Sequence, residues 1–267
     1  MTSAPSDRRA RMRRLHEKFI VEVRTVPASS RRNLYIISAV LMVVGLVAFL
    51  VILDSVRESD GLSAIDKPIQ AWLEGMRTPT LTVVMATIAT VFGPVAMPII
   101  VLVTAVWWGL AARHAWRPLL LAAGMIVGVA IVQILAPVIG RDRPPIDAML
   151  IGVDHTPSFP SGHVMGAIDF LLITTYLVFS RRRNPVSTVI ALVVAALLAI
   201  ATAVCRVYLG YHWPTDVLGS VSLSLVVVGG VVAVDTWRTV RVGPAGEEHA
   251  SAQDPVAGQV TAAGRLP

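Results

Sequence analysis

The sequence predicts an all-α fold, a polytopic membrane protein with six transmembrane helices. Hydrophobic residues make up 55% of the 267 positions and charged residues only 15%, and the mean hydropathy is +0.69, a balance too apolar for an ordinary soluble domain. The apolar residues also gather in stretches of the length that a bilayer needs, about 20 residues for about 30 Å of hydrocarbon. The six stretches are Leu34–Leu53, a segment within Leu81–Ala112, Pro118–Ile139, Val164–Phe179, Val186–Cys205 and Pro214–Val234.

Two of these stretches are irregular. The second is longer than a span and contains Gly93, Pro94 and Pro98, so we expect a kinked or partly interfacial start. The fourth is short, and we expect it to take a turn from the segment before it. Between the first two spans, residues 59–80 place apolar side chains at helical spacing among charges. This pattern is typical of an amphipathic helix in the outer interface, or of a loop helix that covers the bundle.

Positive charges indicate how the chain crosses the membrane. Cytoplasmic loops carry an excess of Lys and Arg, and an even number of spans returns the chain to the side where it started. The clusters that fall on one side are Arg31 and Arg32, then Arg113, His114 and Arg117, then Arg181, Arg182 and Arg183, and then Arg238 and Arg241. We therefore expect a multi-pass protein of the cell membrane with both termini in the cytoplasm.

The chain is expected to divide into three parts. Residues 1–32 form a basic cytoplasmic segment, residues 33–237 the six-span domain, and residues 238–267 a cytoplasmic tail that is disordered from Gly243, because it lacks an apolar period. The basic segment is either a solvated tail or a site for anionic headgroups. No signal peptide is visible, so the first span is expected to be uncleaved.

Charge and cysteine content exclude several classes of protein. The net charge of +6 could suggest a nucleic-acid partner, but the basic residues sit in short clusters between apolar stretches, which is a pattern of membrane topology. The single cysteine, Cys205, excludes an internal disulfide and a thiolate metal cluster. We expect no nucleic-acid partner, and because nothing in the sequence supplies an evident site for one, no metal and no cofactor.

Three polar segments interrupt the apolar pattern, and all three fall on the predicted outer side. The first, residues 140–145, carries Arg141 and Arg143. Pro144 favours an extended backbone before it, and in an extended chain both guanidinium groups would project the same way and could bind an anion.

The second polar segment, residues 158–163, opens the fourth span. Ser161 is a candidate N-cap residue. The free backbone N–H groups of Gly162 and His163 would then point outwards at the start of the helix, where they form an anion site. The His163 side chain stands where it could transfer a proton to or from a bound anion.

The third polar segment, residues 205–216, joins the fifth and sixth spans. Pro214 suits the first turn of a helix, and Asp216 follows His212 by four residues, so the carboxylate can approach the imidazole. That pairing would fix the tautomer and leave the other ring nitrogen free to attack. Two histidines, an Asp and several arginines at one membrane face are what phosphoryl transfer through a phosphohistidine requires.

The three segments resemble the signature motifs of the type 2 phosphatidic acid phosphatase (PAP2) superfamily, in its membrane-bound bacterial branch of lipid phosphatases. The second motif, Pro-Ser-Gly-His, is matched in full by residues 160–163, and the third is matched in spacing by Arg206, His212 and Asp216. Of the first motif, a Lys, six residues and then Arg-Pro, only the Arg143-Pro144 pair is present. The resemblance implies that no metal takes part, that His163 is the general acid, His212 the nucleophile and Asp216 its orienting partner, and that the phosphate is bound by Arg143, Ser161, Gly162 and Arg206.

Two positions depart from the family pattern. Ala136 stands where the family has Lys, and Cys205 replaces the Ser before Arg206. The first change removes one positive contact to the phosphate, and we expect Arg141 to supply it from the same side as Arg143. The second change loses a hydroxyl hydrogen bond.

Other enzyme classes fit the sequence less well. A cysteine phosphatase needs Arg six residues after the Cys, where Tyr211 stands. A serine hydrolase of the nucleophile-elbow type needs Gly two residues before Ser161, where Phe159 stands. A lipid phosphotransferase, and a non-catalytic lipid-binding or transport protein of the same fold, are the alternatives that stay open.

The expected substrate is a membrane lipid phosphate or diphosphate, bound at an outward-facing active site level with the headgroups. The resemblance suggests undecaprenyl diphosphate, phosphatidate or phosphatidylglycerophosphate. Undecaprenyl diphosphate is slightly preferred, because its carrier is dephosphorylated on the outer face. The residues leave two points open: the acceptor, which is water or a second lipid, and the oligomeric state.

Overall fold

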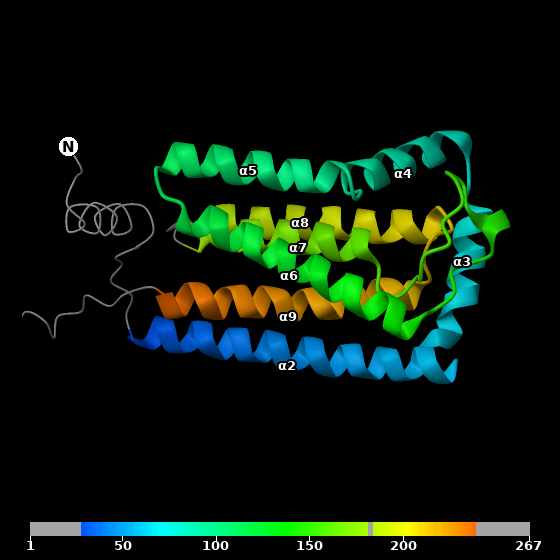
Figure 1. Ribbon diagram of the computed structural model, residues 1–267, viewed down its shortest axis with the longest axis horizontal. Coiled ribbons are helices and arrows are strands. Elements are labelled where there is room, and N and C mark those ends of the chain that lie inside the picture. Colours follow the sequence, from blue (N-terminus) through cyan, green and yellow to red (C-terminus); the bar gives the residue numbers. More distant parts are fainter. Residues whose placement is uncertain (1–27, 181–183, 239–267) are drawn as a thin grey trace, which may run out of the picture.

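The computed structural model describes residues 28–180 and 184–238, and the regular structure in these ranges is helical (Figure 1). This confirms the predicted all-α class. The predictions for residues 1–27, for Arg181, Arg182 and Arg183, and for the tail from residue 239 lie outside the described residues. The elements are α2 (Ala28–Glu58), η1 (Gly61–Ile65), α3 (Asp66–Gly75), α4 (Pro79–Val91), α5 (Ala96–Ala112), α6 (Trp116–Ile139), η2 (Ile146–Ala148), α7 (Gly162–Phe179), α8 (Pro185–Tyr208) and α9 (Pro214–Arg238).

The membrane-spanning helices follow the predicted apolar stretches. Five helices, α2, α6, α7, α8 and α9, are each long and apolar enough to cross a bilayer. Helices α4 and α5, which meet at a bend of 52°, pass the same test as a pair, and counted as one broken span they make a sixth crossing. The break lies at residues 92–95, where Gly93 and Pro94 interrupt the helix, so the predicted kink in the second stretch is confirmed.

The spans lie side by side along the long axis of the molecule, and α3 lies across one end of the bundle (Figure 1). The connections from α6 to α7 and from α8 to α9 reach the same end as α3, whereas Ala28 and Arg238 lie at the opposite end. All three polar segments are therefore gathered at one end of the bundle. The assignment of this end to the outer side of the membrane stays a prediction.

Helix α9, which begins just after His212, packs closely along α2. A Cβ placed on Gly229 would lie 2.7 Å from Met42 Cγ, and one on Gly45 would lie 3.0 Å from Leu225 Cβ. The Ser38 hydroxyl of α2 also donates a hydrogen bond of 2.7 Å to the Gly229 carbonyl. Small residues thus let the two backbones approach, as in many membrane helix pairs, and they anchor the helix that carries Asp216.

Helix α3 is two-faced. Asp66, Gln70 and Leu73 are buried against the rest of the molecule, whereas Trp72 is 63% exposed and Met76 46% exposed. The sequence pattern left a helix in the membrane interface and a loop helix that covers the bundle as alternatives. The structure shows a helix that covers the end of the bundle with its polar side chain Asp66 turned inwards.

Candidate active site

The first turn of α7 presents the Ser161, Gly162 and His163 segment. Ser161 occupies the N-cap position, as predicted, but its side chain makes no capping hydrogen bond. Its backbone N–H instead donates to the Ser220 hydroxyl at 2.7 Å. The Ser161 hydroxyl is buried, and none of the described residues pairs with it. This hydroxyl and the free N–H groups of the first turn are therefore available to an anion.

A tight turn after α8 delivers His212 to the same place. Gly210 has a φ of 81°, and a Cβ at this position would lie 2.6 Å from the Ala148 carbonyl carbon. Glycine is required here both by the left-handed backbone and by the close approach of the neighbouring loop. Helix α9 then begins at Pro214, in agreement with the predicted first-turn position.

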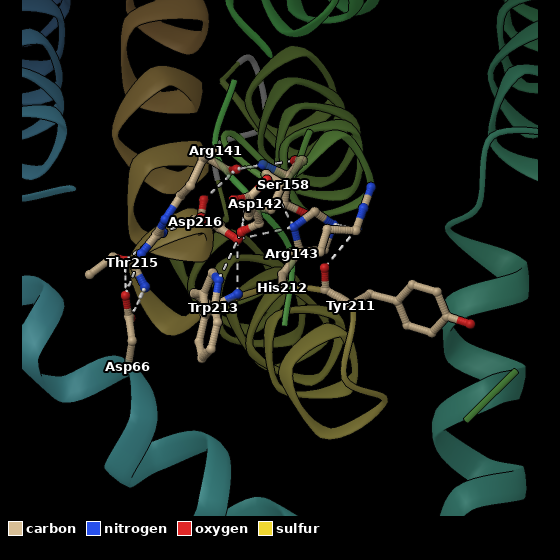
Figure 2. Close-up of polar contacts among 12 residues, drawn as sticks. Asp66, Arg141, Asp142, Arg143, Ser158, Tyr211, His212, Trp213, Thr215 and Asp216 are labelled. Carbon is tan, nitrogen blue, oxygen red and sulfur yellow. Dashed lines mark hydrogen bonds and ion pairs between the residues drawn. The ribbon is translucent and has the colours of Figure 1, made fainter. Parts of the chain in front are cut away.

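The His212 imidazole has two hydrogen-bond acceptors on its Nδ1 side. Its Nδ1 lies 2.8 Å from the Ser158 carbonyl oxygen and 3.4 Å from Asp216 Oδ2 (Figure 2). Both neighbours are acceptors, so they favour the tautomer in which Nδ1 carries the proton. Nε2 then carries the lone pair. The predicted approach of Asp216 to the ring is present, and the carbonyl of Ser158 is an additional partner that sequence reasoning did not find.

Arg143 lies at the free side of the His212 ring. Its Nη1 is 3.3 Å from His212 Nε2 and donates to the Tyr211 carbonyl at 2.7 Å (Figure 2). Its Nε donates to the Thr156 carbonyl at 2.7 Å, and its Nη2 forms an ion pair of 2.9 Å with Asp154. These bonds fix the guanidinium beside the nitrogen that would attack.

Arg206 and His163 complete the group. Arg206 is 4% exposed, stacks over the Tyr211 ring at 4.5 Å, and has a buried Nε that pairs with none of the described residues. His163 is half-buried, and the break between α4 and α5 passes beside it, because a Cβ on Gly93 would lie 3.6 Å from His163 Nε2. A buried guanidinium with an unused donor is costly unless an anion satisfies it.

Arg141 lies elsewhere. Its guanidinium forms ion pairs with Asp216 and, at 2.6 Å, with Asp66 of α3, and it donates to the Thr215 hydroxyl at 2.8 Å (Figure 2). It therefore faces the carboxylate side of His212, away from Nε2, whereas Arg143 faces Nε2. The two guanidinium groups therefore lie on different sides of the His212 ring, and the expectation that they project the same way is wrong.

The backbone explains why the two arginines diverge. In an extended strand, successive carbonyls point in opposite directions. Here the Arg141 carbonyl accepts from the Ser158 N–H at 2.8 Å and the next carbonyl, of Asp142, accepts from the Ser158 hydroxyl at 3.1 Å. Because both carbonyls serve Ser158, the alternation is broken, and the side chains of Arg141 and Arg143 separate with it.

Burial and neighbouring charges keep His212 neutral. The pKa of His212 is lowered to about 4, mainly by burial; the charges of Arg206 and Arg143 also lower it, and the hydrogen bond and charge of Asp216 act to raise it. A neutral imidazole is the form that can attack phosphorus. The pKa of Arg143 is also lowered by burial, against the charges of Asp154 and Asp216.

Asp154 is held as a carboxylate at the rim of the site. Burial acts to raise its pKa, but the hydrogen bonds from Thr156 and the charge of Arg143 outweigh burial, so the pKa is lowered.

Within residues 28–180 and 184–238, no group of three or more His, Cys, Asp and Glu side chains is arranged to hold a metal ion.

Comparison with known proteins agrees with this description. The family model of the PAP2 superfamily matches residues 117–239, which run from the second residue of α6 past the end of α9 and include every residue of the candidate site except Asp66 and Gly93. Phosphatidylglycerophosphatase B of Bacillus subtilis is 29% identical over 189 residues, which is 68% of this chain and 89% of that protein. Phosphatidylglycerophosphatase B of Escherichia coli is 39% identical over 90 residues, 33% of this chain and 31% of that protein.

Solved structures show the same fold. The crystal structure of the transmembrane PAP2-type phosphatidylglycerolphosphate phosphatase from Bacillus subtilis has a TM-score of 0.64 and 25% identity, covering 73% of this chain and 96% of that one. The structure of Aquifex aeolicus LpxE has a TM-score of 0.50 and 19% identity, covering 63% and 94%, which is a likeness of fold alone.

The fold and the gathered histidines and arginines define a multi-pass membrane enzyme of the phosphatase class. Residues 117–239 match the PAP2 superfamily, and the chain is structurally similar to a transmembrane PAP2-type phosphatase. It is a phosphoric ester hydrolase, a homologue of phosphatidylglycerophosphatase B.

Proposed function

We propose that this enzyme removes phosphate from a membrane lipid through a phosphohistidine on His212. The observation that carries the proposal is the geometry of His212: Nδ1 is committed to Ser158 and Asp216, while Nε2 faces Arg143 at 3.3 Å. A nucleophile with its tautomer fixed on one side and a cation on the other is arranged for attack on a phosphoryl group. The unpaired donors of Ser161 and Arg206 supply further contacts for its oxygens.

The reaction proceeds in two steps. In the first, His212 Nε2 forms a bond to phosphorus while the bond from phosphorus to the lipid oxygen breaks, and His163 gives its proton to that leaving oxygen. In the second, His163 takes a proton from water, the water oxygen bonds to phosphorus, and the N–P bond breaks to release inorganic phosphate. Arg143 and Arg206 balance the charge of the phosphoryl oxygens in both steps.

Phosphatidylglycerophosphate is the first substrate to test, because the Bacillus subtilis and Escherichia coli relatives are named as its phosphatases. Undecaprenyl diphosphate and phosphatidate belong to the same panel, since each presents a phosphate at the level of the headgroups. The assay is release of inorganic phosphate from each lipid in detergent micelles. Wild type should release phosphate from at least one of them, and His212→Ala should abolish it. Equal release by wild type and His212→Ala would contradict the proposal.

The phosphohistidine itself can be trapped. With a lipid substrate labelled in the phosphate, rapid quenching in base should leave label on the protein, because phosphohistidine is stable to base and labile to acid. His212→Gln should carry no label. Recovery of the label on a second lipid in place of inorganic phosphate would instead identify the enzyme as a phosphotransferase.

We further propose that the site lies on the outer face of the cell membrane, as the positive-inside pattern predicts. The chain has a single cysteine, Cys205, which is buried in α8. In a Cys205→Ser background, a cysteine placed at the exposed Asp147 should react with a membrane-impermeant maleimide added to intact cells. A cysteine at the exposed Arg113, at the other end of the bundle, should react only after lysis. The reverse pattern would place the site inside.

A further inference from the structure

A chain of charged side chains runs from α3 to the nucleophile. Asp66 in the first turn of α3 forms an ion pair with Arg141 at 2.6 Å. Arg141 forms an ion pair with Asp216, and Asp216 Oδ2 lies 3.4 Å from His212 Nδ1. Asp66 and Asp216 are separated by 150 residues in the sequence and meet through one guanidinium (Figure 2).

The chain is buried and largely satisfied. Asp66 is 3% exposed and Asp216 is fully buried. Besides Arg141, Asp66 accepts from the Thr215 N–H at 2.9 Å and from the Thr215 hydroxyl at 2.7 Å. Asp216 also accepts from the Trp213 N–H at 2.8 Å. Buried ion pairs of this kind contribute little net stability compared with apolar packing, but they hold both carboxylates in one orientation.

The geometry points to Asp66 and Arg141 as positioning residues, which hold the Asp216 carboxylate, and through it the His212 ring, from the surface helix α3. This inference rests on the proposed function of His212. It assigns to Arg141 a different role from a phosphate contact, because its guanidinium is bonded to Asp66, Thr215 and Asp216 on the side of the ring away from Nε2. Asp66 lies outside the matched family region.

The charges around His212 give the two residues opposite effects on its titration. The positive charge of Arg141 offsets the negative charge of Asp216, whose hydrogen bond raises the pKa of His212. Arg141→Met should therefore strengthen the action of Asp216 and raise the pKa. In Asp66→Asn, Arg141 would pair with Asp216 alone and offset more of its negative charge, so the pKa of His212 should fall. The other charged or titratable groups that act on His212 are unchanged in both variants: Arg143, Arg206, His163 and Asp154.

The experiment compares kinetics and titration in full-length variants purified in detergent. Residues that orient metal ligands from behind typically contribute 10- to 100-fold to activity. By analogy with that range, we expect kcat to fall roughly tenfold in Asp66→Asn and up to about 100-fold in Arg141→Met. KM and the inhibition constant of inorganic phosphate should stay within about twofold, since neither residue contacts the phosphate. The acid limb of kcat/KM should move up in Arg141→Met and down in Asp66→Asn.

Matched controls separate position from chemistry. Asp147→Asn and Arg57→Met make the same substitutions at exposed positions at the same end of the bundle, and both should behave as wild type. Asp66→Asn is isosteric and keeps an acceptor for the Thr215 N–H, so it is the variant least disturbed in folding. In the double variant of Asp66→Asn and Arg141→Met, the loss should not exceed that of Arg141→Met alone, because the two residues act in series.

Two results would overturn the inference. A higher KM and phosphate inhibition constant in Arg141→Met, with its acid limb unmoved, would make Arg141 a phosphate contact. If Asp66→Asn had the same kcat and the same acid limb as Asp147→Asn, α3 would have no role in positioning His212. Titration of the His212 ring by NMR with labelled histidine gives the same pKa shifts without turnover. It therefore tests the positioning role even if none of the lipids proves to be a substrate.

Discussion

Replacing Asp216 by Asn should slow the enzyme only moderately, because Asp216 is not the sole partner of His212. The Ser158 carbonyl oxygen is the nearer acceptor of the Nδ1 proton, at 2.8 Å against 3.4 Å for Asp216 Oδ2. In Asp216→Asn the carbonyl remains, so the reactive tautomer is kept, and the amide oxygen can still accept from the Trp213 N–H. What is lost is the negative charge beside the developing positive charge of the attacking ring.

The size of the expected loss in kcat/KM follows from the presence of two acceptors at Nδ1. Loss of one charged acceptor at a site that keeps a second one is expected to cost about 1.4 to 2.7 kcal/mol, or roughly 10- to 100-fold in kcat/KM. A catalytic dyad whose carboxylate alone sets the tautomer loses about 10⁴-fold on the same change. The assay is kcat/KM for phosphate release from the preferred lipid, with Asp147→Asn as the matched control.

The pH profile gives an independent reading of the same variant. Because Asp216 raises the pKa of His212, removing its charge should lower that pKa further and move the acid limb to lower pH. A loss of 10⁴-fold or more would refute the role given to Ser158. A loss of less than twofold with an unmoved acid limb would refute the role given to Asp216.

Three further outcomes are expected. In wild type the acid limb of kcat/KM should rise through about pH 4 as the His212 ring loses its proton, so an acid-limb midpoint near 6.5 would contradict the buried neutral nucleophile. His163→Asn should slow release from lipid substrates by about 10²- to 10⁴-fold but release from p-nitrophenyl phosphate far less, because that leaving group needs no proton; equal losses would count against His163 as the acid. Gly210→Ala should lower Tm by about 4 °C or more, from left-handed strain of about 1 to 2 kcal/mol together with the contact with Ala148, whereas an unchanged Tm would show that the turn relaxes freely.

The fold was predictable from the sequence because hydropathy acts over each span separately. A run of apolar residues must cross the bilayer as a helix whatever its neighbours do, so the spans and the break at Gly93 could be placed without tertiary information. The proximity of Asp216 to His212 is equally local, since the two residues are four positions apart at the start of α9. These parts of the site depend on spacing along the chain.

The remaining contacts depend on how distant segments meet. Ser158 acts through a backbone carbonyl, which every residue type carries and no motif can mark. Asp66 reaches Arg141 across 75 residues, and in the sequence it is one of several acids in an outer loop. The side on which Arg141 lies follows from two carbonyls that serve Ser158, a detail of loop geometry that an extended-chain argument misses.

The pairing of α2 with α9 sets the order in which the enzyme can be assembled. These are the first and the last described spans in chain order, and they pack closely through Gly45, Gly229 and the Ser38 hydroxyl. During synthesis α2 is made first among the described spans, and it has no α9 to pack against until the others have been made. His212 and Asp216 lie just before and within the first turn of α9, so a nascent chain that ends before this segment lacks the proposed nucleophile and its carboxylate partner.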